Sequence, residues 1–78
     1  MVYCNYLRNT DSVVEYIFGE TTDDLTGNVV YDYKQDIMNI IKEPDDCPVM
    51  PRHLQSVFRK HRNEFINGEL KKKIAYEA

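Results

Sequence analysis

The three prolines of the chain all lie in one short stretch, PDDCPVMP at residues 44–51. Proline fixes φ and has no backbone N–H to donate, so we expect an irregular connector here rather than a helix or a strand. The connector divides the chain into two parts, and each part has its own pattern of apolar residues. Pro51, the last residue of the stretch, stands where proline is favoured, at the first position of a helix.

The residues after the connector have the spacing of an amphipathic helix. Side chains that suit one buried face recur at intervals of three and four, at Leu54, Val57, Phe58, His61 and Phe65. Gly68 follows, where a glycine in the left-handed conformation ends a helix. We therefore predict a helix over about 51–66. The segment 69–76 alternates apolar and polar residues, which predicts a final strand, with a helical extension as the alternative.

The part before the connector is rich in β-branched and aromatic residues. Residues 2–8 (VYCNYLR) and 13–19 (VVEYIFG) predict two strands, because such side chains suit a half-buried pleated surface. The turn-forming run NTDS at 9–12 joins them in a hairpin. Residues 28–33 (NVVYDY) predict a third strand.

Residues 33–43 fit two interpretations. Tyr33, Ile37, Ile40 and Ile41 fall at helical spacing, and Asp32 with Gln35 has the pattern of a helix capping box. The three isoleucines are β-branched, however, and YKQD at 33–36 would turn the chain back into a paired strand at 37–43. We favour the second hairpin.

These patterns together predict an α+β fold. We expect one domain over 1–78, in which a small antiparallel sheet of three to five strands packs against the main helix. Its parts are 1–43, mainly strands, 44–50, the connector, 51–67, the helix, and 69–76, the final strand. The helix residues Leu54, Val57, Phe58 and Phe65 should meet either Val14, Tyr16 and Phe18 or the alternate set Val13 and Ile17.

Two acidic stretches raise the question of a metal site. In FGETTDDLTG at 18–27 the acids are adjacent rather than alternating, and Tyr33 stands where an EF-hand would place its last glutamate. The stretch PDDC at 44–47, with His53 beyond it, lacks the paired cysteine or histidine ligands of a zinc site. We interpret the first stretch as a turn between strands and the second as a surface loop, and expect neither a metal nor a cofactor.

Catalytic groups are hard to find in a chain of 78 residues, which leaves little room for a cleft beside a core. Cys4 lies within a predicted strand, and the acidic neighbours of Cys47 raise the pKa of a thiol and so oppose nucleophilic attack. No glycine-rich phosphate loop is present. We predict that the protein is not an enzyme; a thiol enzyme would require Cys47 to be unusually reactive.

The sequence also bears on location. No apolar run approaches the length that crosses a bilayer, and we find no secretion signal. Two cysteines without such a signal are typical of reduced thiols. We expect a cytoplasmic protein with no membrane contact.

Charge is unevenly distributed along the chain. Residues 1–50 hold three basic and ten acidic side chains, whereas residues 51–78 hold seven basic and three acidic. The basic residues give the helix a basic face that the tail could extend, and this is our candidate binding surface: Arg52, Arg59, Lys60, Arg62, Lys71, Lys72 and Lys73. A solvated helix face would show the same pattern.

We interpret this surface as that of a small protein-binding or adaptor module, with the acidic loops 20–24 and 43–46 as a second site. Its partner would be another protein or a second copy, particularly if a sheet edge is left open. The alternative is a nucleic-acid-binding or regulatory protein that contacts phosphates through the same cations. A net charge of −3 opposes attraction to nucleic acid at long range.

Overall fold

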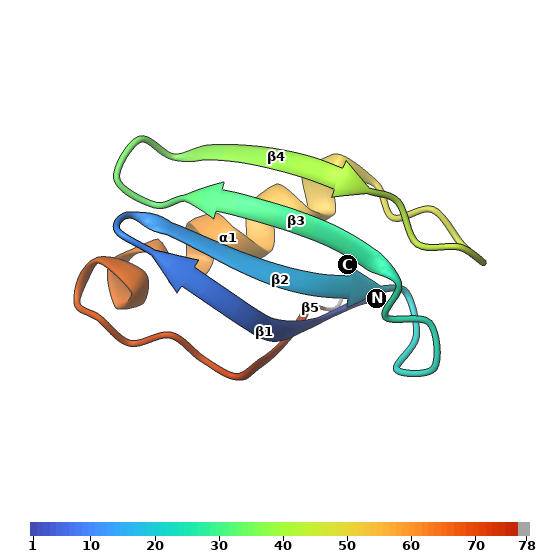
Figure 1. Ribbon diagram of the computed structural model, residues 1–78. Helices are drawn as coiled ribbons and strands as arrows, with labels where there is room; N and C mark the ends of the chain where they lie inside the picture. The colour runs from blue at the N-terminus through green and yellow to red at the C-terminus, as the bar shows by residue number, and fades with distance from the viewer. Residues whose placement is uncertain (77–78) are drawn as a thin grey trace.

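The computed structural model describes residues 1–76 and has an α+β fold, a five-stranded antiparallel sheet with one helix (Figure 1). The elements follow in the order β1 (Val2–Thr10), β2 (Val13–Gly19), β3 (Gly27–Asp32), β4 (Ile37–Lys42), α1 (Pro51–Ile66) and β5 (Lys73–Tyr76). The predicted fold class, the N-terminal hairpin and the helix are confirmed.

The sheet has the strand order β4-β3-β2-β1-β5. The first four strands form a meander in which each strand pairs with the next along the chain. β5 returns from the end of the helix and pairs antiparallel with β1, with Cys4 opposite Ile74. The first and last strands of the described chain therefore lie side by side, and β4 and β5 form the edges of the sheet.

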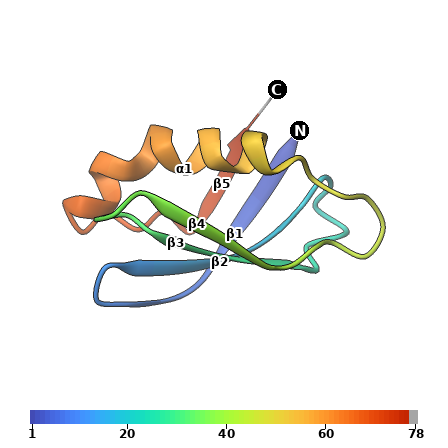
Figure 2. The ribbon, with the colours of Figure 1, turned by 90° about the horizontal axis from the view of Figure 1, so that it is seen from above.

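The helix covers one face of the sheet, as the view from above shows (Figure 2). Leu54, Val57, Phe58 and Phe65 are buried, as the spacing predicts. On the sheet they meet the set that contains Val14, Tyr16 and Phe18, all fully buried, and this decides between the two faces left open by the sequence. Within the described chain no helix covers the opposite face.

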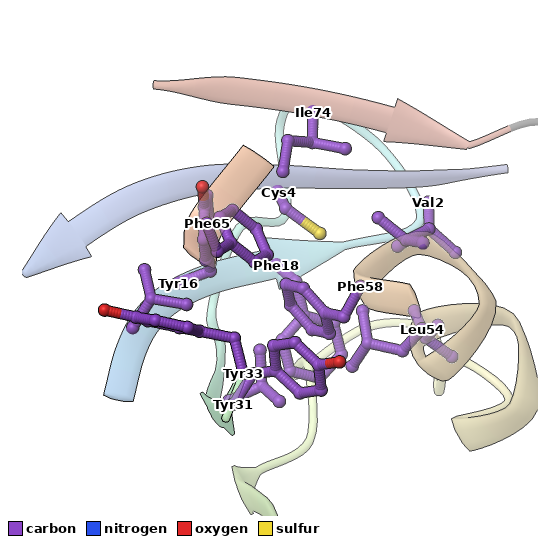
Figure 3. Close-up of a cluster of buried hydrophobic side chains, with 14 residues drawn as sticks. Val2, Cys4, Tyr16, Phe18, Tyr31, Tyr33, Leu54, Phe58, Phe65 and Ile74 are labelled. Carbon is purple, nitrogen blue, oxygen red and sulfur yellow. The ribbon is translucent and has the colours of Figure 1, made fainter. Parts of the chain in front are cut away.

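Aromatic rings fill the space between the helix and the sheet (Figure 3). Phe58 stacks on Tyr31, with ring centroids 5.1 Å apart and planes inclined by 15°. It also contacts Tyr16 at 5.6 Å, and Phe65 packs on Tyr16 at 6.2 Å. Ring pairs at these separations stabilise a core beyond the area they bury.

The buried tyrosines fix the connecting segments through their hydroxyl groups. Tyr16 donates to the carbonyl of Lys71 at 2.6 Å, and Tyr33 donates to the carbonyl of Asp11 at 2.7 Å. Tyr31 donates to Asp36 Oδ1 at 2.7 Å. Each ring thus lies in the core while its hydroxyl holds a loop at the rim.

The second hairpin, β3–β4, is confirmed, and the helical alternative for residues 33–43 is wrong. Asp32 Oδ1 accepts from the backbone N–H groups of Lys34 and Gln35, both at 3.1 Å. Asp32 therefore accepts from backbone N–H groups, as a helix-capping residue would, but these N–H groups belong to the β3–β4 turn. Asp36 completes the turn with φ of 57°, a conformation that aspartate tolerates.

The final strand begins later than the alternating pattern predicts. It spans Lys73–Tyr76 rather than 69–76, and the helical extension is absent. Gly68, with φ of 85°, ends the helix, and its N–H donates to the carbonyl of Phe65. The residues that follow first cross from the helix to the edge of the sheet. They reach β1 at Lys72, whose carbonyl accepts from the N–H of Tyr6 at 2.8 Å.

Candidate functional site

The basic residues of the candidate surface do not form one continuous patch. Arg59 and Arg62 contact the β3–β4 turn. Arg59 Nε lies 3.1 Å from Asp36 Oδ2. Arg62 donates through Nε to the carbonyl of Tyr33 at 2.6 Å and through Nη2 to the carbonyl of Lys34 at 2.8 Å. Both guanidinium groups thus join the helix to the hairpin.

Two of the three tail lysines also have partners within the chain. Lys71 Nζ lies 3.4 Å from Glu64 Oε1, and the other oxygen of Glu64 lies 3.0 Å from His61 Nδ1. These contacts, that with His61 first, lower the pKa of the Glu64 carboxyl, although partial burial opposes them. Lys72 Nζ lies 4.4 Å from the centroid of the Tyr6 ring, a cation–π contact.

Arg52, Lys60 and Lys73 are exposed and make no ion pair within residues 1–76. Arg52 and Lys60 belong to α1. Lys73 stands opposite Asn5, whereas the next residue, Ile74, is buried in the core. Because side chains alternate along a strand, Lys73 lies on the sheet face away from the helix. The structure therefore separates Lys73 from the two cations on α1.

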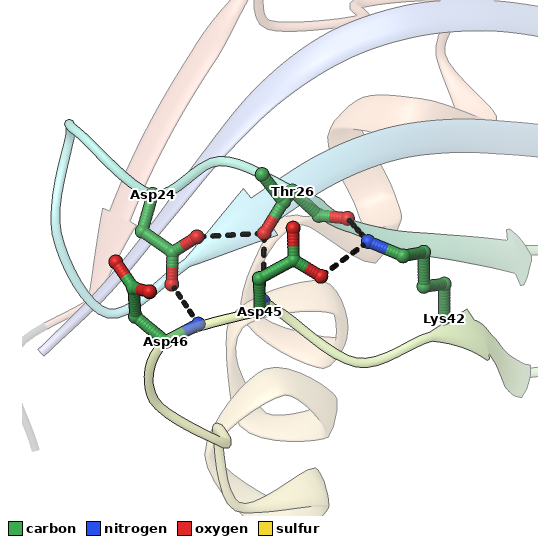
Figure 4. A network of polar contacts seen from close by, with 5 residues as sticks. All are labelled: Asp24, Thr26, Lys42, Asp45 and Asp46. Atoms are coloured by element: carbon green, nitrogen blue, oxygen red, sulfur yellow. Dashed lines mark hydrogen bonds and ion pairs between the residues drawn. The ribbon is translucent and has the colours of Figure 1, made fainter.

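The two acidic stretches form a clasp between loops (Figure 4). Asp24 is only 5% exposed, and its oxygens accept from the Thr26 hydroxyl at 2.6 Å and from the N–H of Asp46 at 3.0 Å. Thr26 Oγ1 in turn accepts from the N–H of Asp45 at 2.8 Å. Lys42 Nζ donates to Asp45 Oδ1 at 2.8 Å and to the Thr26 carbonyl at 3.0 Å.

Sequence reasoning missed this clasp, because it treated 20–24 and 43–46 as separate acidic loops. The local signal was the spacing of Asp24 and Thr26, which suits a short-range hydrogen bond between side chains. The partners on 45–46 are distant in sequence and gave no signal. Among residues 1–76, no three histidine, cysteine, aspartate or glutamate side chains converge as metal ligands would.

The two thiols differ in environment but share a raised pKa. Burial raises the pKa of the Cys4 thiol to about 12. Cys47 is exposed, and its pKa is raised first by a hydrogen bond with Glu20 and then by the charges of Glu20, Asp46 and Asp24. The direction predicted for Cys47 from its acidic neighbours is confirmed, and a raised pKa disfavours the thiolate that a nucleophile requires.

The open face of the sheet carries a shallow hollow of about 410 Å³. Residues of β1, β5 and the β2–β3 loop line it: Tyr3, Asn5, Thr22, Leu25, Lys73, Ile74 and Ala75. These residues offer an ammonium group, two hydroxyls and an amide, but no carboxylate, imidazole or thiol. The hollow therefore has groups that can form hydrogen bonds and bind a negative charge.

The two edges of the sheet differ sharply. β5 has four residues and follows directly on Lys71 and Lys72. β4 has six residues, IMNIIK, and its Ile37 and Ile41 side chains are 53% and 62% exposed. Within the described chain no strand pairs with the outer side of β4, which forms the upper border of the sheet in Figure 1.

Comparison with known proteins gives no match to any family model, curated protein or solved structure. No helix in the described part of the chain is long and apolar enough to cross a membrane.

Proposed function

We propose that this protein is a non-enzymatic protein-binding module that pairs the open edge of β4 with an extended segment of a protein partner. The observation that carries the proposal is the long, nearly uncharged β4 edge flanked by two exposed isoleucines. Strand addition at such an edge gains main-chain hydrogen bonds, while the side chains beside it provide specificity.

The contrast between the edges supports β4 as the contact surface. Natural proteins protect sheet edges with short strands and with lysines, and β5 has both features. On β4 the only charge is Lys42, at its last position, where Asp45 already binds it. The one protective feature of β4 is a register shift near its end, between Asn28 and Val29 of β3, which leaves Ile37–Ile40 regularly paired.

Burial of the two isoleucines would add to the main-chain bonds. Full burial of an isoleucine side chain contributes about 1.5–3 kcal/mol relative to full exposure. Because Ile37 and Ile41 are already partly covered, each would contribute a fraction of this amount. Apolar side chains on a free edge have no evident structural role in the isolated chain, whereas a docked strand would cover them.

The nucleic-acid alternative has less support. Arg59, Arg62 and Lys71 have partners within the protein, and Lys73 lies on the face opposite the helix. A phosphate backbone would therefore meet Arg52 and Lys60 as the main unpartnered cations on α1. We propose a reducing, cytoplasmic setting for the module, which suits two free thiols.

Site-specific photo-crosslinking in cells that express the protein tests the proposal. A photoreactive amino acid would replace Ile41 at the β4 edge or, as the matched control, Ile66, which is 50% exposed at the end of the helix. We expect discrete protein adducts from position 41 and few from position 66. No adduct at position 41, or the same adducts from both positions, would contradict the proposal.

A further inference from the structure

We infer that the strand docked on β4 is β4 of a second copy of this chain, so that two sheets join edge to edge about a two-fold axis. This inference rests on the proposed function and names its partner. It follows from which backbone N–H and C=O groups of β4 point outward, from the order of the side chains in the strand, and from the position of Lys42, the only charged residue of β4.

The hydrogen bonds of the sheet determine which backbone groups of β4 are free. The N–H of Tyr33 donates to the carbonyl of Ser12 at 3.0 Å. In an antiparallel ladder, hydrogen-bonded and non-hydrogen-bonded pairs alternate. Val14–Tyr31 is therefore a bonded pair between β2 and β3, and the residue before Tyr31, Val30, directs its backbone groups toward β4.

Val30 stands opposite Asn39, so the backbone groups of Asn39 are used within the sheet. Met38 and Ile40, on either side of Asn39, then direct their N–H and C=O groups outward. Two copies related by an antiparallel two-fold axis at Asn39 bring Met38 of one chain opposite Ile40 of the other. Each such pair exchanges two backbone hydrogen bonds, and the arrangement is symmetric as a closed dimer requires.

The side chains fit the same register. With the axis at Asn39, Ile37 of one chain lies across from Ile41 of the other, at the register shift near the end of β4, so that the two exposed isoleucines of the strand meet. Cross-strand pairs of β-branched residues stabilise a sheet. Both ends of the ribbon gain this contact, because the two-fold axis repeats it.

The charge of β4 favours a second copy in this orientation. Lys42 is the only charged residue of the strand. In the antiparallel register the two Lys42 residues lie at opposite ends of the ribbon, and each lies beside the Asp36 turn of the other chain. Like charges directly opposite each other would destabilise a sheet, and this register avoids them.

A cysteine at the axis tests both the partner and the register. Asn39 would form a non-hydrogen-bonded pair with its own counterpart, with Cα atoms about 4.5 Å apart, within the range of a disulfide. In a Cys47→Ser background, which removes the exposed native thiol, we expect N39C to form a covalent dimer under mild oxidation. The matched control, I66C in the same background, should remain largely monomeric.

Sedimentation equilibrium measures the association without a crosslink. We expect wild-type protein to pass from monomer to dimer with rising concentration, and the double variant I37K/I41K to lose at least tenfold in dimer affinity. I66K should associate like the wild type. Because Ile37 and Ile41 are exposed, I37K/I41K should keep the wild-type circular dichroism spectrum, which separates loss of association from loss of folding.

The outcomes separate this inference from the proposed function. Wild-type protein that stays monomeric at millimolar concentration, or equal disulfide yields from N39C and I66C, would overturn the second-copy inference. If the crosslinker at Ile41 then captured a different protein, the proposed function would stand with another partner. If the crosslinker captured no protein at all, neither another protein nor a second copy, the second-copy inference and the proposed function would both be wrong.

Discussion

Asp24 is a charged residue that is almost completely buried. Its carboxylate lies between the two loops and accepts hydrogen bonds from Thr26 and from the backbone of Asp46. The hydrogen bond from Thr26 is the main reason that its pKa is lowered, and burial acts in the opposite direction. The negative charge therefore belongs to the structure of the loops, and we do not assign it to a ligand.

The Asp24→Ala variant should be less stable than the wild type at neutral pH, because the Asp46 N–H and the Thr26 hydroxyl lose their acceptor. A carboxyl group whose pKa is lowered by folding stabilises the protein above its unfolded pKa and loses this effect as pH falls through the folded value. We expect the difference in Tm to be largest near pH 7 and to shrink below about pH 4. Thermal melts over pH 3–7 measure it.

The exposed neighbour Asp23 provides the control. Asp23→Ala should keep a Tm close to that of the wild type across the same range, because Asp23 is not part of the clasp. A Tm difference for Asp24→Ala that stays constant down to pH 3 would contradict the assigned role of the charge.

Phe58 and Asp24 show what can be read from a sequence at the scale of one residue. The burial of Phe58 was predictable, because Phe58 belongs to a set of apolar residues that recur at intervals of three and four along one helix. Asp24 was not, since its partner N–H at Asp46 belongs to a different loop, 22 residues away. A periodic pattern records burial along one element, but it does not record which loops meet.

At the scale of elements, the helix is attached to the β3–β4 hairpin by Arg62. Its guanidinium group donates to two carbonyls of the turn, those of Tyr33 and Lys34. Arginine suits this role because its planar group presents several donors in a fixed geometry. The turn thus uses a cation that the sequence pattern had placed in a binding surface.

Arg62→Ala should lower the free energy of unfolding by about 1–2 kcal/mol, because hydrogen bonds from a charged donor are lost. Urea denaturation followed by circular dichroism measures the change. Lys60→Ala is the matched control, since Lys60 is an exposed cation on the same helix, and it should change stability by less than about 0.5 kcal/mol. Equal effects from the two variants would refute the structural role of Arg62.

Element types were predictable to different degrees. The helix was clear because proline, the apolar spacing and Gly68 agree on its ends. Residues 33–43 were ambiguous because Asp32 and Gln35 suit both a helix start and a turn, and only pairing with β3 decides between them. The start of β5 was misplaced because the alternation begins at residue 69, while the chain is still crossing from the helix to the sheet. It reaches β1 at Lys72, whose carbonyl accepts from the N–H of Tyr6.

At the scale of the whole molecule, the pairing of β5 with β1 leaves β4 as the unprotected edge. The sequence could not predict this asymmetry, because it depends on which strand the C-terminal segment joins. For the same reason the sequence could not show whether the tail extends the basic face of the helix, because the position of the tail depends on the strand that it joins. The placement of Lys73 on the far face separates it from that surface.

Edge pairing between two copies would make the stability of each chain depend on protein concentration. If dimers dissociate when the chains unfold, mass action favours the folded state more strongly as concentration rises. Each tenfold increase above the dissociation constant adds about 1.4 kcal/mol for each dimer. For a dimer of this size the Tm should then rise by about 3–6 °C for each tenfold increase.

Differential scanning fluorimetry or circular dichroism over a hundredfold range of concentration measures this dependence. The variant I37K/I41K should show a Tm that stays constant over the range, because its edge no longer pairs, whereas I66K should rise with the wild type. A flat Tm for the wild type, over concentrations at which dimers persist up to the melting temperature, would contradict pairing between folded chains. Any contact that only folded chains make raises the Tm by mass action, and extension of the sheet from β4 is such a contact.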